Sequence, residues 1–123
     1  MILVDTSVWI EHLRSASAIL RELLGDGEVL GHPFVPGELA LGNLRQRDEI
    51  LRMLRRLPQT TSASHGEVLQ FIEREALFGR GIGYVDAHLL AAVRLTAGSK
   101  LWTRDRRLQL VATQLGLAAA LPH

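Results

Sequence analysis

Short apolar runs alternate along this chain with longer segments in which apolar residues recur every three or four positions. The apolar runs predict strands at residues 2–4, 28–31 and 100–103, and a last short strand at 116–121. The helical period, with its capping and breaking residues, predicts helices at 6–14, 17–24, 35–44, 48–57, 64–78, 85–97 and 105–115. Strands separated by helices indicate an α/β fold, with a short parallel sheet flanked by helices on both faces in three layers.

Length and composition predict one globular domain over residues 1–123. Hydrophobic residues make up 47% of the chain and charged residues 22%, which is typical of a domain with a packed core. The chain has no cysteine, which excludes disulfide frameworks and thiolate metal sites. No apolar stretch approaches the roughly 18 residues of a membrane span, and the first apolar run stops at Asp5 without a basic leader. We therefore expect a cytoplasmic protein.

Most of the thirteen acidic residues lie on polar helix faces or in first helical turns, but four do not. Asp5 and Asp105 each follow an apolar strand and start a helix. The carboxyl ends of parallel strands meet at one edge of a sheet, so these two side chains are expected to converge. Asp86 opens the most apolar helix, and Glu38 lies in an apolar neighbourhood.

Two interpretations of these acids remain open at this point. Asp5, Asp86 and Asp105 all stand where helix N-caps occur, and Glu38 fits a helix surface. Alternatively, carboxylates gathered at a buried sheet edge need a charge partner, and no Lys or Arg closely flanks Asp5 or Asp86. Oxygen ligands of this kind select Mg²⁺ or Mn²⁺. Such a metal site favours phosphodiester hydrolysis by a metal-activated water.

Other catalytic arrangements find no support in the sequence. There is no nucleophile elbow, and the glycine-rich segment 79–83 lacks the lysine of a phosphate-binding loop. A phospho-receiver module would need paired acids after the first strand, where Asp5 stands alone. A haloacid-dehalogenase-type phosphatase would need a second Asp at position 7, where Ser7 stands instead.

Four segments resemble the motifs of PIN domains, and the resemblance extends over nearly the whole chain. They are residues 2–7 around Asp5, 36–39 around Glu38, 85–92 around Asp86, and 101–105 ending at Asp105. A PIN domain of this length standing alone is similar to the VapC toxins of VapBC toxin–antitoxin pairs. A catalytically silent PIN-like or receiver-like interaction module is the alternative.

The resemblance implies a site and a set of partners. Asp5, Glu38, Asp86 and Asp105 would hold one or two Mg²⁺ or Mn²⁺ ions, while the hydroxyls of Thr6, Ser7 and Thr103 would orient the carboxylates or water. The implied activity is cleavage of single-stranded RNA, often in loops of tRNA or rRNA. The implied partners are a VapB-type antitoxin and a second copy of the chain.

The arginines around Asp105 depart from the family pattern. Many relatives carry an acidic or amide residue just after the fourth Asp, whereas Arg106 and Arg107 follow it here. This departure argues against a second metal ion. It favours RNA phosphate binding by Arg104, Arg106 and Arg107, against the simpler interpretation of a solvated helix start. The 79–83 segment is either a mobile rim of the site or a plain connection.

Overall fold

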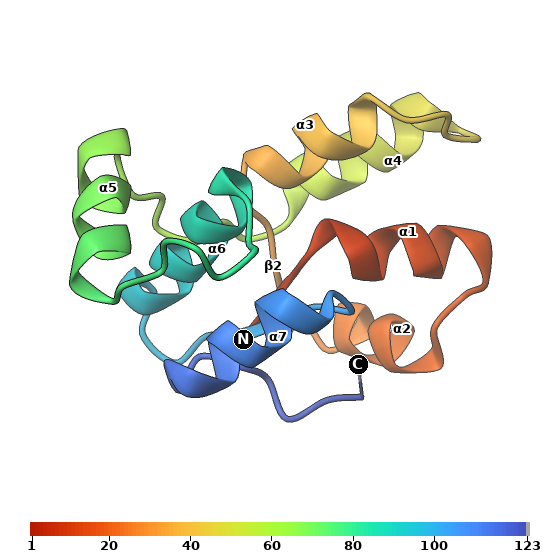
Figure 1. The fold of residues 1–123 in the computed structure, drawn as a ribbon. Coiled ribbons are helices and arrows are strands. Elements are labelled where there is room, and N and C mark those ends of the chain that lie inside the picture. Colours follow the sequence, from red (N-terminus) through yellow and green to blue (C-terminus); the bar gives the residue numbers. More distant parts are fainter. Residues whose placement is uncertain (123) are drawn as a thin grey trace.

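The computed structural model describes residues 1–122, which form three strands and seven helices (Figure 1). The strands are β1 (Ile2–Val4), β2 (Val29–Leu30) and β3 (Lys100–Trp102). The helices are α1 (Thr6–Arg14), α2 (Ala18–Gly25), α3 (Phe34–Ala40), α4 (Arg47–Arg56), α5 (His65–Arg74), α6 (Tyr84–Leu95) and α7 (Arg106–Gln114). No helix among these residues combines the length and apolar character that a membrane crossing requires.

The sheet is parallel, with the strand order β2-β1-β3. Successive strand residues point to opposite faces, and both Leu3 and Val4 are 0% exposed, so helices cover the two faces of β1. The predicted three-layer α/β/α fold is confirmed. The predicted strand at 116–121 is reduced to one parallel bridge, between Leu101 and Ala118.

The helices lie where the sequence predicts them, except that two end early. α3 stops at Ala40 instead of residue 44, and Leu41 beyond it is 91% exposed, so this turn finds no apolar surface to cover. α5 stops at Arg74 instead of residue 78, because Ala76 adopts a left-handed conformation (φ 52°) and the Leu77 amide bonds back to the Ile72 carbonyl.

The core lies around α6, which is buried along most of its length as its composition predicts. Both tryptophans are core residues, with Trp9 1% and Trp102 3% exposed. Leu13, on the same helix as Trp9, is 38% exposed and lies outside this core.

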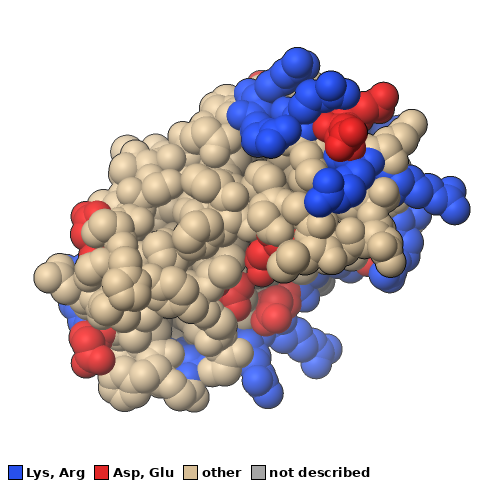
Figure 2. All heavy atoms as spheres, turned by 90° about the horizontal axis from the view of Figure 1, so that it is seen from above, with Lys and Arg blue, Asp and Glu red and all other residues tan. Residues whose placement is uncertain are grey.

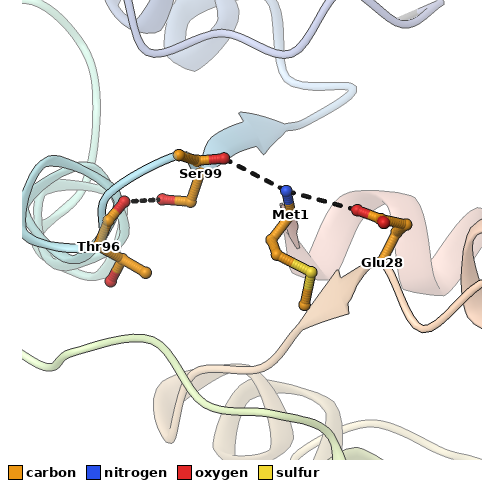
Figure 3. A network of polar contacts seen from close by, with 5 residues as sticks. Met1, Glu28, Thr96 and Ser99 are labelled. Atoms are coloured by element: carbon orange, nitrogen blue, oxygen red, sulfur yellow. Dashed lines mark hydrogen bonds and ion pairs between the residues drawn. The ribbon is translucent and has the colours of Figure 1, made fainter.

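The amino ends of the strands are held together by the chain terminus (Figure 3). The Met1 ammonium group lies 3.5 Å from a carboxylate oxygen of Glu28 and donates to the Gly98 carbonyl at 3.3 Å. In the same turn, the Ser99 hydroxyl donates to the Thr96 carbonyl at 2.7 Å. These contacts link β1 to the segments before β2 and β3. Asp5 lies at the opposite end of the sheet, directly after the last residue of β1.

Candidate active site

Asp5 is a buried carboxylate at the end of the central strand, with 5% of the residue exposed. Its amide continues the β1–β3 ladder by donating to the Trp102 carbonyl at 2.9 Å. Its Oδ2 atom accepts from the Ser7 hydroxyl at 2.6 Å, from the Thr103 hydroxyl at 2.7 Å and from the Ser7 amide at 3.4 Å. Asp5 thus caps α1 while its charge is stabilised by hydroxyl donors instead of a cation.

Ser7 and Thr103 also connect the ends of β1 and β3 to Asp105. Their hydroxyl oxygens are 3.2 Å apart, and Ser7 Oγ accepts from the Arg104 amide at 3.0 Å. Thr103 Oγ1 accepts from the Asp105 amide at 3.0 Å. Asp105 is the exposed N-cap of α7, and its Oδ1 accepts from the Leu108 amide at 3.0 Å. One hydroxyl pair therefore places two of the four acids.

Glu38 and Asp86 come from helices α3 and α6. Glu38 is hydrogen-bonded to α1: the hydroxyl of Thr6, the first residue of that helix, donates to Glu38 Oε1 at 2.7 Å. Asp86 lies in the first turn of α6, and its Oδ2 accepts from the Gly83 amide at 2.9 Å, so it helps to cap this helix. Each of the three hydroxyl residues suggested by the family resemblance therefore bonds to one of the candidate carboxylates.

The four acids act on one another electrostatically. Burial is the main factor that raises the pKa of Asp86, and the charges of Asp5, Asp105 and Glu38 raise it further, against the lowering effect of the Gly83 amide. The ion pairs among residues 1–122 are Met1–Glu28 and Arg94–Glu75, so none of the four is neutralised by a basic side chain. In Figure 2, acidic side chains gather in a hollow, with basic side chains beyond it on either side.

The donor set fits a hard divalent cation in its chemistry. All four candidate ligands are carboxylates without an ion-pair partner, and the charges of the other three, after burial, raise the pKa of Asp86. As the side chains lie, no three potential ligands among residues 1–122 converge closely enough to hold an ion directly. Mg²⁺ keeps several of its waters and uses one or two protein carboxylates directly, so the other acids would contact it through these waters. The N-cap interpretation holds for Asp5 and Asp105. It is wrong for Asp86, because the N-cap of α6 is Gly83 and Asp86 lies in the first turn, where it accepts from the Gly83 amide.

The three arginines around Asp105 differ in their surroundings. Arg104 and Arg106 line an open hollow of about 510 Å³ along α7. Arg107 instead lies over the backbone of Gly81, where an added Cβ atom would stand 2.7 Å from Arg107 Cδ. The 79–83 segment is attached to α7 a second time, because Arg80 hydrogen-bonds to Gln114. Of the two interpretations of this segment, the packed connection agrees with these contacts.

Two features near the site escape sequence reasoning. An open groove of about 560 Å³ begins at Glu38 and runs between α1 and the α3–α4 connection. Its lining is mainly apolar, with two arginines beside the apolar side chains: Ile10, Leu13, Leu44 and Ile50, with Arg14 and Arg45. The available sequence signal was the pair of apolar residues Ile10 and Leu13 on α1, which are 45% and 38% exposed. The Gly83 amide that bonds Asp86 has no sequence signal, because it depends on backbone geometry.

Comparison with known proteins agrees with this architecture. A family model described as PIN domain matches residues 2–114. Two curated relatives, both called Ribonuclease VapC32, come from Mycobacterium tuberculosis strains CDC 1551 / Oshkosh and ATCC 25618 / H37Rv. Each is 55% identical over 120 residues, which cover 98% of this chain and 97% of the relative. The receiver-like alternative is therefore wrong, and the chain belongs to the PIN-domain family, as a member of the VapC type.

Proposed function

We propose that this protein is a Mg²⁺- or Mn²⁺-dependent endoribonuclease that acts in the cytoplasm as the toxin of a toxin–antitoxin pair. The observation that carries the proposal is the cluster of four unpaired carboxylates, in which three raise the pKa of the fourth. Helix capping by itself does not require the caps of three helices to lie close enough to repel. The ribonuclease name of the relatives supports the same activity.

Within this proposal, Asp5, Glu38, Asp86 and Asp105 hold the cation. The bound metal supplies Lewis-acid chemistry, polarising a phosphoryl oxygen and lowering the pKa of a water. The hydroxyls of Ser7 and Thr103 hold Asp5 in one orientation, and that of Thr6 does the same for Glu38.

RNA binding is assigned to the arginines after β3. Arg104 and Arg106, which flank Asp105, neutralise the phosphates on either side of the cleaved bond. Arg107, the third member of this group in the sequence, packs on Gly81 and takes a smaller part in RNA binding. The substrate class is single-stranded RNA, with tRNA and rRNA loops as the first candidates.

The proposed partners are a VapB-type antitoxin and a second copy of the chain. Exposed aromatic side chains near the start of α6 offer a surface for the second copy: Phe34 is 38%, Phe78 63% and Tyr84 43% exposed. Aromatic residues are enriched at protein interfaces, and a two-fold interface brings the same surface of both copies together. Sedimentation of the antitoxin-free protein measures this association.

The direct test is cleavage of total cellular RNA by purified, antitoxin-free protein with Mn²⁺, with Mg²⁺ and with a chelator. We expect discrete metal-dependent fragments, and a loss of rate of about 100-fold or more for Asp86→Asn, which retains an acceptor for the Gly83 amide. Glu73→Gln, the same chemical change at an exposed position of α5, is the matched control and should cleave like the parent. Equal cleavage with chelator would contradict metal dependence. No cleavage by a folded protein would favour a silent PIN-like module.

A further inference from the structure

We propose that Arg107 is a positioning residue that braces the loop before α6 and thereby holds Asp86 in place relative to Asp105. The inference rests on the proposed function, because it assigns Arg107 a role toward two residues of that site. It separates Arg107 from Arg104 and Arg106, with which the sequence groups it.

The first observation is the close approach of Arg107 to Gly81. A Cβ atom built on Gly81 would lie 2.7 Å from Cδ, 2.8 Å from Nη1 and 3.2 Å from Cζ of Arg107, distances that real contacts do not allow. The guanidinium therefore lies directly on the glycine backbone. Gly81 also has a φ of +80°, a conformation that side chains oppose. The positive φ favours glycine at this position, and a side chain here would also have to displace Arg107.

The second observation is that the braced loop leads directly to a candidate ligand. Two residues after Gly81, the Gly83 amide donates to Asp86 Oδ2 at 2.9 Å. A displacement of the loop would move this donor and release the carboxylate from its present orientation. Ile82, between the two glycines, is half-buried against the core, so the loop is held from two sides.

The third observation is the place of Arg107 on α7. Asp105 is the N-cap of this helix, and Arg107 lies in its first turn. Arg80 makes a second attachment by hydrogen bonding to Gln114, the last residue of α7. The loop thus lies against α7, the helix that starts at Asp105 (Figure 1). The brace joins the start of the helix carrying Asp86 to the start of the helix capped by Asp105.

The test compares Arg107→Met with Arg106→Met, a change of the same type at a neighbouring exposed position outside the Gly81 contact. Amide hydrogen exchange of residues 79–86 in metal-free protein is the first readout. It requires neither RNA nor metal, so it remains valid if the proposed function fails. We expect exchange to accelerate about tenfold in Arg107→Met and to stay at the parent rate in Arg106→Met. Parent-like exchange in Arg107→Met would overturn the proposal.

Metal affinity and kinetics are the second readouts. In Arg107→Met, calorimetry with MnCl₂ should show affinity about tenfold weaker, as for other residues that orient ligands, and kcat should fall while KM for RNA rises less than in Arg106→Met. In Arg106→Met, KM should rise with Mn²⁺ affinity unchanged. A rise in KM with parent-like Mn²⁺ affinity in Arg107→Met would overturn the proposal and make Arg107 an RNA contact.

A second variant distinguishes the loss of the Arg107–Gly81 contact from a general loss of stability. Gly81→Ala displaces Arg107 from the loop without altering the arginine itself, and it also strains the loop backbone at a φ of +80°. If both changes abolish the same contact, their effects on amide exchange should not add. The double variant Gly81→Ala/Arg107→Met should then exchange little faster than the faster of the two single variants. Fully additive effects of the two changes would contradict the brace.

Discussion

The buried charge of Asp5 shows what one residue of this site requires of its neighbours. A carboxylate that is 5% exposed is costly unless donors surround it, and here the donors are two hydroxyls and one amide. Hydroxyl donors stabilise the charge without neutralising it, so Asp5 keeps its attraction for a cation. An arginine in the place of Ser7 or Thr103 would satisfy the carboxylate and compete with a metal.

His32 is the second buried polar residue with a consequence at this scale. It is 1% exposed, its Nδ1 accepts from the Phe34 amide at 3.1 Å, and its Nε2 has no partner among residues 1–122. Because Nδ1 accepts, Nε2 carries the hydrogen of a neutral ring. Burial, followed by the charge of His88, lowers the pKa of His32 from 6.5 to about 4.

We predict from His32 that the protein loses stability in mild acid. Below pH 6.5 the unfolded chain takes up a proton that folded His32 refuses until about pH 4, so the free energy of unfolding falls as the pH falls through this window. Each pKa unit corresponds to about 1.4 kcal/mol, which makes the loss about 2–3 kcal/mol at pH 4.5. Urea unfolding at several pH values measures it.

The matched variant is His32→Asn, which keeps an acceptor near the Phe34 amide but does not titrate. Its stability should depend less steeply on pH between 6.5 and 4. An unchanged slope would show that His32 is not the group responsible.

At the scale of elements, several helices begin with a side chain that serves the helix itself. α5 begins with a capping box, in which Ser64 Oγ accepts from the Glu67 amide at 3.1 Å and Glu67 accepts from the Ser64 amide at 2.8 Å. The Asp5 and Asp105 caps use the same local chemistry, but the charges of their carboxylates also raise the pKa of Asp86. Capping and catalysis are therefore compatible at one residue, because a carboxylate has two oxygens and several lone pairs.

Ser64→Ala should separate stability from activity. We predict a loss of about 1 kcal/mol in the free energy of unfolding, the usual effect of removing a serine cap, with metal-dependent cleavage unchanged. Chemical denaturation and the RNA assay measure the two quantities. The control is Ser62→Ala in the exposed segment before the helix, which should change stability by less than about 0.5 kcal/mol. An equal loss in both variants would contradict the capping role.

At the scale of the whole molecule, the fold concentrates negative charge that a cation should relieve. We predict that Mn²⁺ stabilises the protein against heat, because it binds the folded site and not the unfolded chain. At a concentration 100 times the Kd, the gain is about 2.7 kcal/mol, visible as a higher Tm by scanning calorimetry. A Tm that does not respond to Mn²⁺ would argue against a metal site.

The metal-free Asp86→Asn variant is the informative control for this measurement. The raised pKa of Asp86 means that its ionised form destabilises the folded state once the pH exceeds that pKa. At neutral pH without metal, the variant should therefore melt above the parent, and it should gain less from Mn²⁺. A lower metal-free Tm would show that the Gly83–Asp86 cap outweighs the repulsion.

The sequence by itself determined the elements and their starts. The apolar runs predict β1 and β3, the capping pattern predicts the start of α5, and the uniform apolar character of α6 predicts its central burial. These features follow from hydrogen bonds and side-chain periods that reach no more than about four residues along the chain, so they can be read from neighbours. The early ends of α3 and α5 were missed, because α3 stops where Leu41 finds no apolar surface to cover and α5 stops at the left-handed Ala76.

The tertiary structure decided which chemical groups meet. The Thr103 hydroxyl bonds to Asp5 across 98 positions of sequence, and that of Thr6 reaches Glu38 across 32. Both contacts depend on the strand order β2-β1-β3 and on helix packing, which no local pattern specifies. The same is true of Arg107, which the sequence groups with the neighbouring arginines and the fold directs onto Gly81. Local interactions choose the elements of this protein, while long-range packing chooses the neighbours of each side chain, and the chemistry of the site depends on those neighbours.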